Sequence, residues 1–187
     1  MKESMIYLES VDYIQKKIKD ILSKVSKDDI NKVKELFLNA NRIFVYGAGR
    51  SGLVAKAFAI RLVHLGFQTF VIGETITAPV QNGDLVVIVS GSGETIPAVM
   101  TAEIAHNLGA YVISITAKKQ SEIAKYADVT LYIESTCYEL KRKKFAPLGT
   151  LFEASVWILF DGMIADLLNS KNETEEIMRS RHATLEH

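Results

Sequence analysis

Two glycine-rich stretches contain most of the side chains that could bind a small anion. Residues 47–52 read Gly-Ala-Gly-Arg-Ser-Gly, and residues 90–95 read Ser-Gly-Ser-Gly-Glu-Thr. Glycines let the backbone come close to an anion, and hydroxyls and unpaired N–H groups at the start of a helix donate hydrogen bonds to it. This combination suits a terminal phosphate monoester. The residues predicted to bind such a substrate are Gly49, Arg50, Ser51, Ser90, Ser92 and Thr95.

Each stretch also has a simpler interpretation. The first matches the dinucleotide-binding pattern G-x-G-x-x-G, and Glu74 stands near the position of an acidic ribose ligand, about 20 residues further on. A nicotinamide-dependent dehydrogenase is therefore an alternative. The second stretch, which a dinucleotide fold does not need, could serve only as a helix cap. Arg50 could form a surface ion pair instead of contacting the phosphate or the sugar hydroxyls.

Short apolar runs that alternate with amphipathic segments must position these stretches. Helices are predicted between the runs, at 53–65, 96–108 and 121–126, and from Leu151 onward. This order predicts an α/β fold in three layers, α/β/α, with a doubly wound, five-stranded parallel sheet. In such a sheet, ligands bind beyond the carboxyl ends of the strands. The predicted strands, apolar throughout and therefore buried on both faces, are 43–46, 69–72, 85–89, 111–115 and 129–133.

The first 40 residues are predicted to form a helical arm that precedes the first strand. One apolar stripe runs from Tyr7 to Val25, and a second helix follows with Val33 and Phe37 on one face. The stripe suits either a partner chain or the chain's own domain. We expect one domain over residues 1–187, divided into the arm at 1–40, the α/β core at 41–170 and a helical C-terminal tail at 171–187.

The composition is that of a globular protein without a strong overall field. Among the 187 residues, 22 Lys and Arg balance 22 Asp and Glu, so net charge does not attract nucleic acid or anionic membranes. The single cysteine, Cys137, cannot form an intrachain disulfide, and no apolar run is long enough to span a bilayer. No histidine–carboxylate cluster has metal-ligand spacing. We therefore expect a cytoplasmic protein that binds no nucleic acid, membrane or metal.

Several short motifs together resemble the sugar isomerase (SIS) domain family. The serine-glycine stretch is common to SIS domains and implies only sugar-phosphate binding. The motif at 147–153, the short chain and the Arg-His pair near its end are similar to the subgroup that isomerises hexulose 6-phosphates. The resemblance implies a flavodoxin-like fold. The motifs are Gly-Arg-Ser-Gly at 49–52, His-Leu-Gly at 64–66, Gly-Glu-Thr at 73–75, the stretch at 90–95, Pro-Leu-Gly-Thr-Leu-Phe-Glu at 147–153 and Arg181-His182.

The resemblance implies an isomerase that interconverts D-arabino-3-hexulose 6-phosphate and D-fructose 6-phosphate through an enediol, in the ribulose monophosphate pathway of formaldehyde metabolism. It assigns Glu153 as the base that moves a carbon-bound proton, and His182 as a tail group that polarises the carbonyl or shuttles hydroxyl protons. An internal proton shift needs no cofactor. The resemblance also implies a homotetramer that is paired in function with 3-hexulose-6-phosphate synthase.

Other interpretations of the candidate catalytic residues stay open. Thr150-Leu-Phe-Glu153 spells a capping box, in which the carboxylate would bind only a backbone N–H. His182 lies in a polar tail that could be disordered or could reach a neighbouring subunit. His64 and His106 are more typical of structural histidines, and His187 is assigned no role.

Two alternatives concern the function as a whole. The chain could be a non-catalytic SIS module that senses a sugar phosphate, or an isomerase of another phosphosugar. The basic run Lys141–Lys144 is predicted to be a solvated loop with at most a minor part in attracting an anionic substrate.

Overall fold

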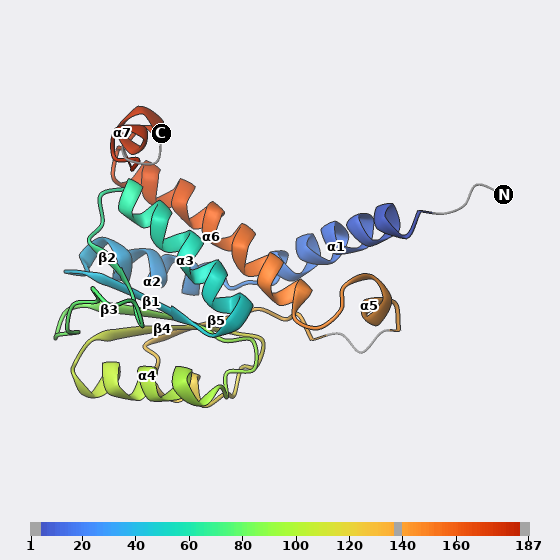
Figure 1. Cartoon of the computed structure of the whole chain (residues 1–187), viewed down its shortest axis with the longest axis horizontal. Coiled ribbons are helices and arrows are strands. Elements are labelled where there is room, and N and C mark those ends of the chain that lie inside the picture. The colour runs from blue at the N-terminus through green and yellow to red at the C-terminus, as the bar shows by residue number, and fades with distance from the viewer. Residues whose placement is uncertain (1–4, 137–139, 184–187) are drawn as a thin grey trace.

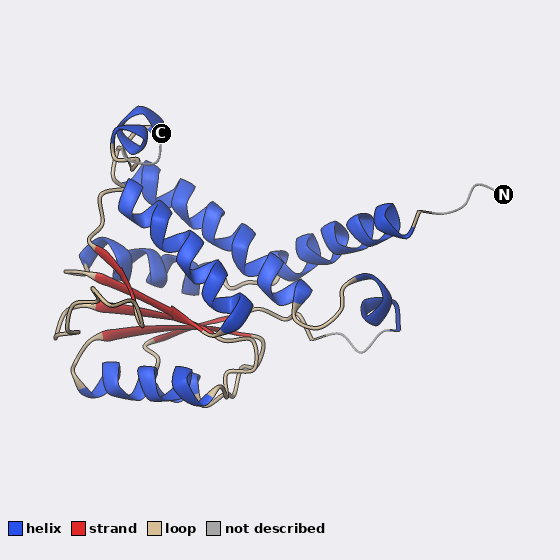
Figure 2. Cartoon of the chain, viewed as in Figure 1, coloured by secondary structure: helices blue, strands red, loops and turns tan. Residues whose placement is uncertain are grey.

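The structure, a computed structural model, describes residues 5–136 and 140–183. Within these residues, five strands form a single sheet in the order β2-β1-β3-β4-β5, and every neighbouring pair is parallel. This is the doubly wound, flavodoxin-like order, so the predicted fold class is confirmed. Figure 2 shows the sheet between two layers of helices. The strands are β1 (Ile43–Gly47), β2 (Thr69–Val71), β3 (Leu85–Val89), β4 (Tyr111–Thr116) and β5 (Val129–Tyr132).

Helices cover both faces of the sheet (Figure 1). One face carries α2, α3 and α6, and the other carries α4 and the short 3-10 helix η1. No helix in the described parts of the chain is long and apolar enough to cross a membrane. The helices are α1 (Ile6–Ser23), α2 (Lys27–Asn39), α3 (Gly49–His64), α4 (Ile96–Asn107), η1 (Ile123–Tyr126), α5 (Leu140–Phe145), α6 (Thr150–Ser170) and α7 (Glu175–Ser180).

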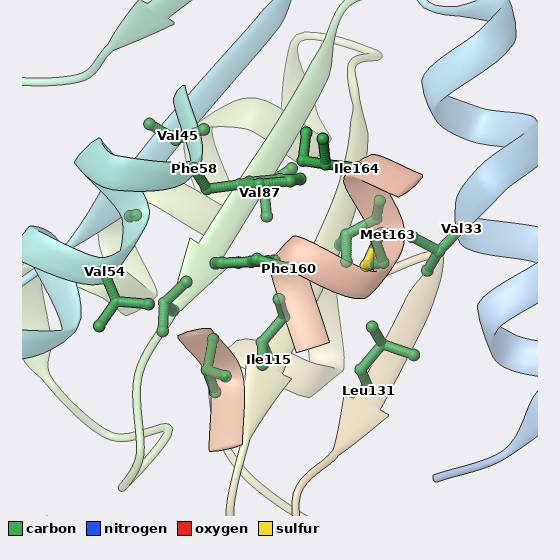
Figure 3. Close-up of a cluster of buried hydrophobic side chains, with 14 of the residues drawn as sticks. Val33, Val45, Val54, Phe58, Val87, Ile115, Leu131, Phe160, Met163 and Ile164 are labelled. Carbon is green, nitrogen blue, oxygen red and sulfur yellow. The ribbon is translucent and has the colours of Figure 1, made fainter. Parts of the chain in front are cut away.

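The larger part of the core lies between the sheet and the layer that contains α3 and α6 (Figure 3). Alternate strand residues point to opposite faces, so Val45, Val87 and Ile115 all belong to this cluster. Phe58 of α3 stacks on Phe160 of α6 with ring centroids 3.9 Å apart. This packing holds α6 firmly across the sheet, and α6 in turn carries the predicted base.

The N-terminal segment divides into two helices with different surroundings. Val33 and Phe37 of α2 are buried in the core cluster on the face of the sheet that α3 and α6 cover. In α1, Ile18 and Ile21 are buried, whereas the first turn extends away from the α/β core (Figure 1). Its side chains are largely exposed, from 57% for Ile6 to 67% for Tyr7. The first turn of α1 therefore projects from the molecule.

Two local predictions were wrong. The helix predicted from Leu53 begins at Gly49, because the glycine stretch itself forms the first turn of α3. The basic run predicted as a loop forms α5 instead. Tertiary contacts hold this short helix: the Phe145 ring lies 5.8 Å from the Tyr13 ring of α1, and Ser10 Oγ donates to the Phe145 carbonyl at 2.5 Å.

Candidate active site

The two glycine-rich stretches follow neighbouring strands. β1 ends at Gly47 and β3 ends at Val89, and these residues are register partners in adjacent parallel strands. The helices that follow, α3 and α4, lie on opposite faces of the sheet (Figure 1). This is the switch point at which open α/β sheets bind ligands. The stretches therefore meet at the edge of the sheet where the sequence predicts a site.

The hydroxyls of the second stretch form a cluster. Thr95 precedes α4, but its side chain makes no capping hydrogen bond. Its Oγ1 lies 3.3 Å from Ser90 Oγ and 3.4 Å from Ser92 Oγ. Ser90 is buried and accepts a hydrogen bond from Gly93 N at 3.1 Å, whereas Ser92 is exposed. Helix capping by the Thr95 side chain therefore does not account for the cluster.

Glycine is required at specific points of both stretches. Gly93 has φ +65°, and an added Cβ would lie 2.3 Å from the Cβ of Ser121. An added Cβ at Gly52 would lie 2.5 Å from the Gly47 carbonyl oxygen. In the first stretch, close packing of the β1–α3 turn thus explains the spacing that resembles a dinucleotide-binding pattern.

A cavity of about 360 Å³ brings three of the predicted site residues together. Ser51 of α3, Ser92 of the second stretch and Glu153 of α6 all line it. Thr95 and Ser90 lie behind Ser92 in the hydroxyl cluster. The volume is typical of a site for a small molecule. The other lining residues are Gly91, Ala117, Ser135, Thr136, Arg142, Leu148, Gly149, Leu151 and Phe152.

Glu153 lies in the first turn of α6 but forms no capping box. The residue before the helix is Gly149, and the Thr150 hydroxyl donates to the Pro147 carbonyl at 2.6 Å. The Glu153 side chain is 13% exposed, and its Oε2 accepts a hydrogen bond from Arg50 Nε. A Cβ at Gly149 would lie 3.0 Å from Glu153 Oε1, so this glycine leaves room for the carboxylate.

Arg50 forms an ion pair, as its alternative interpretation predicted. Its partner is Glu153, the candidate base. Its side chain is 70% exposed. Arg50 and Glu153 also border a second, largely apolar cavity of about 420 Å³ between α3 and α6, together with Leu53 and Trp157. Glu153 therefore lines both cavities, whereas Arg50 lines only the second.

The structure does not bring His182 to Glu153 within one chain. Glu153 is at the start of α6, and His182 follows α7, beyond the other end of α6 (Figure 1). A helix of 21 residues is roughly 30 Å long. The His182 ring stacks on the His64 ring with centroids 4.9 Å apart. Burial lowers the pKa of His64 below its ordinary value of 6.5, and the charges of His182 and Arg61 lower it further.

The described part of the tail is docked on the domain. Arg181 forms two hydrogen bonds of 3.0 Å with the Glu173 carboxylate and donates to the His64 carbonyl at 3.1 Å. The guanidinium covers Gly66, where an added Cβ would lie 3.0 Å from it. These contacts fix the direction in which the chain leaves α7.

The remaining candidates lie apart from the cavity. The Glu74 carboxylate forms a salt bridge of 2.5 Å with Lys56, and the His106 ring lies 6.2 Å from the Tyr126 ring. Cys137 and His187 lie outside the described residues. Within residues 5–136 and 140–183, no group of three or more His, Cys, Asp and Glu is arranged to hold a metal ion.

Sequence reasoning missed several residues that line the cavity. Ser135 and Thr136 follow β5, so the rule that ligands bind beyond strand ends could have found them. Arg142 belongs to the basic run, and only α5 directs it toward the cavity. Gly91 is restricted by Phe152, whose ring would lie 3.2 Å from an added Cβ.

A doubly wound sheet with a serine-glycine turn at its switch point is the arrangement that the sequence resemblance predicts. Comparison with known protein families supports it. Residues 36–137 match the SIS domain. The chain belongs to the SIS domain family.

Relatives with a more specific name align over most of the chain. A Bacillus subtilis protein named 3-hexulose-6-phosphate isomerase is 38% identical over 165 residues, which are 87% of this chain and 89% of that protein. A Methylomonas aminofaciens protein of the same name is 36% identical over 94% of this chain and 97% of its own. A crystal structure from Methanococcus jannaschii, described as inferring a function of 3-hexulose-6-phosphate isomerase, has a TM-score of 0.84 at 30% identity and covers 95% of this chain and 99% of that one.

Proposed function

We propose that the protein is a phosphosugar isomerase that interconverts D-arabino-3-hexulose 6-phosphate and D-fructose 6-phosphate. One observation carries the proposal: a single cavity is lined by the hydroxyls of Ser51 and Ser92 and by the carboxylate of Glu153. The hydroxyls suit a phosphate, and the carboxylate suits a proton transfer on the sugar attached to it. The relatives named 3-hexulose-6-phosphate isomerase support this choice of substrate.

In the proposed mechanism, the phosphate binds to Ser51, Ser90, Ser92 and Thr95, and the open-chain sugar extends toward Glu153. The Glu153 carboxylate removes the proton from C2 of the 3-ketose, which forms a 2,3-enediol. It then returns the proton to C3, while the hydroxyl proton moves from the oxygen on C2 to the oxygen on C3. The product is the 2-ketose phosphate, so atoms and electrons balance without an oxidant or reductant.

Arg50 has a clear part in this mechanism. Its hydrogen bond to Glu153 Oε2 orients the carboxylate and leaves Oε1 for the substrate. A fixed positive charge next to the reacting carbons also stabilises the negative charge that develops on the enediol oxygens. Gly49, which has φ +57° and begins α3, allows the turn that presents Arg50 and Ser51.

We further propose that the active form is a homotetramer in which His182 reaches the site of a neighbouring subunit. Two features support an assembly: the exposed apolar side chains at the start of α1, and the apolar cavity that begins at Glu153. Both expose apolar surface that a second chain would bury. His182 would then move the hydroxyl protons.

The proposed context is the ribulose monophosphate pathway in the cytoplasm. There, 3-hexulose-6-phosphate synthase would form the substrate by adding formaldehyde to a pentulose phosphate. The isomerase would make this addition favourable by removing its product.

A coupled assay tests the proposed activity. The protein is supplied with the 3-hexulose 6-phosphate, and fructose 6-phosphate is measured through glucose-6-phosphate isomerase and an NADP-dependent dehydrogenase. We expect turnover by the wild type and a loss of kcat of about 10²- to 10⁴-fold in Glu153→Gln, which removes the base. Glu74→Gln, which removes another ion-paired carboxylate, is the matched control and should keep its activity.

The same assay separates the alternatives. A sugar-phosphate sensor would show no turnover in either protein, although both would bind fructose 6-phosphate in calorimetry. An isomerase of another phosphosugar would prefer arabinose 5-phosphate or sedoheptulose 7-phosphate in a substrate panel. Tight, saturable binding of NADH would favour a dehydrogenase and contradict the proposal.

A further inference from the structure

The cavity that contains Glu153 is also lined by a guanidinium group, that of Arg142 on α5. Among its described lining residues, Arg142 and Glu153 are the only charged side chains. The positive charge of Arg50 is already paired with Glu153. Within the described residues, Arg142 is therefore the one cation of this cavity without an acidic partner, and a phosphate monoester would bring close to two negative charges to it.

The contacts of Arg142 differ from those of the arginines that stabilise the fold. Arg42 pairs with Asp84 and Arg181 pairs with Glu173, each through two hydrogen bonds of 3.0 Å or less. Within the described residues, Arg142 has no acidic partner. Its Nη1 donates to the Leu148 carbonyl at 3.1 Å, and its Nε is buried without a hydrogen-bond partner. The described residues therefore leave the positive charge of this guanidinium without an acidic partner.

The backbone around Arg142 holds the guanidinium in place. Leu148 has φ +55°, a left-handed conformation that is unfavourable for a leucine. Its side chain is 91% exposed, so side-chain packing does not explain this conformation. The strained turn directs the Leu148 carbonyl to Arg142 and leads directly into α6 and Glu153. Strain of this kind is concentrated where a site must be held in one geometry.

The neighbouring cations are placed differently. Lys141, Lys143 and Lys144 belong to the same helix, but all three are exposed and none lines the cavity. The two contacts of α5 with Ser10 and Tyr13 of α1 fix its orientation. One member of the basic run is therefore selected by the fold, and the others remain on the surface.

We propose that Arg142 is a substrate-binding residue that neutralises the phosphate of the sugar phosphate, with the hydroxyls of Ser51 and Ser92 as the neutral donors. This inference rests on the proposed function for the identity of the sugar but not for the phosphate. The planar guanidinium can donate two parallel hydrogen bonds to a phosphate, which a lysine cannot do. Arg142 thus selects for the charged end of the substrate, and Glu153 acts on its carbonyl end.

Binding measurements with inorganic phosphate and with fructose 6-phosphate test the assignment by titration calorimetry. We expect Arg142→Gln to weaken the binding of both ligands by about tenfold or more, because a charge-assisted hydrogen bond is lost. Arg142→Lys should restore part of the affinity. Lys143→Gln removes the same charge from the same helix and should change the affinity by less than about twofold, since an exposed lysine contributes little.

Kinetics and pH sharpen the test. In the isomerase assay, Arg142→Gln should raise KM by a similar factor and leave kcat nearly unchanged. The difference between the wild type and Arg142→Gln should shrink below about pH 6, where the phosphate loses its second charge. A phosphate affinity equal to that of the wild type, or an equal loss in Lys143→Gln, would overturn the assignment. Circular dichroism and the melting temperature verify folding, and Arg142→Lys keeps the aliphatic stem if the glutamine variant is unstable.

The outcomes also distinguish this inference from the proposed function. If the wild type does not isomerise the hexulose phosphate but Arg142→Gln still loses phosphate affinity, the assignment of Arg142 stands and the proposed function fails. If the wild type turns over the substrate and phosphate affinity is unchanged in Arg142→Gln, the assignment of Arg142 fails alone.

Discussion

The two ends of α6 differ in what surrounds them. At its start, Glu153 lines a cavity near the carboxyl ends of the strands. Past its other end, the chain turns into α7, and His182 stacks on His64 away from the sheet edge where ligands bind. The length of α6 therefore separates the two predicted catalytic groups, Glu153 at its start and His182 beyond its end. The comparison teaches that one chain brings only one of the two predicted catalytic groups to the cavity. Under the proposed mechanism, a second copy would supply the other.

The strongest test of this comparison mixes two inactive variants. Glu153→Gln and His182→Asn should each lower kcat, the second by roughly 10²-fold as expected for loss of a proton-transfer group. If His182 acts in a neighbouring subunit, exchange of subunits should restore about a quarter of wild-type activity, because half of the random pairs are hybrids and each hybrid has one intact site. Activity is measured after refolding the two variants together.

Native mass spectrometry serves as the control for this experiment, since it shows whether hybrids have formed. Mixed oligomers that stay inactive would contradict a site shared between subunits.

A second test asks whether the turn between β3 and α4, which contains the hydroxyl cluster, tolerates a side chain at Gly93. Gly93→Ala should lower the free energy of unfolding by about 2–4 kcal/mol, because the new Cβ would meet Ser121 and the Thr116 hydroxyl at φ +65°. Gly73→Ala is the matched control: it also has a positive φ but no atom within 4 Å of the added Cβ. It should cost only about 1 kcal/mol. Urea unfolding measures both, and equal costs would show that the clash is not decisive.

The smallest expected effect concerns the other end, at His64. Because its pKa is lowered in the folded protein, the unfolded chain binds the proton more readily. The contribution of neutral His64 to the free energy of unfolding is therefore fully present above about pH 6.5. It is lost as the pH falls from there through the pKa of His64 in the folded protein. His64→Gln should reduce this slope in thermal unfolding below pH 6.5.

NMR titration of the His64 imidazole gives the direct measurement. Its midpoint should lie below 6.5 and should rise in His182→Asn, which removes one of the charges that lower it. Burial, the larger cause, stays in place, so the rise should be incomplete. A midpoint at or above 6.5 in the wild type would contradict the expected environment.

The sheet could be predicted closely from the sequence. All five predicted runs became strands, with ends within one residue of the prediction. Central strands such as β3, which is buried at every residue, require apolar side chains on both faces, so the pattern itself carries the information. The hydroxyl cluster followed from the same logic, since Ser90–Thr95 comes directly after the third strand.

The surroundings of the cavity could not be predicted in the same way. Leu140–Phe145 has four consecutive basic residues and no apolar stripe, so no local pattern indicates a helix. Contacts with Ser10 and Tyr13, which are distant in sequence, stabilise it. The pairing of Arg50 with Glu153 likewise joins α3 and α6 across the fold. Interactions between distant elements leave no periodic signal.

By itself, the sequence determined the order of strands and helices, the edge of the sheet at which a ligand binds, and the hydroxyls available to a phosphate. These features depend on local pattern and on the geometry common to parallel sheets. Only the tertiary structure decided that Arg142 faces the cavity, that Glu153 pairs with Arg50 instead of capping its helix, and that His182 lies beyond the far end of α6. The physical reason is that side chains meet according to how helices pack, and packing depends on residues far apart in the chain.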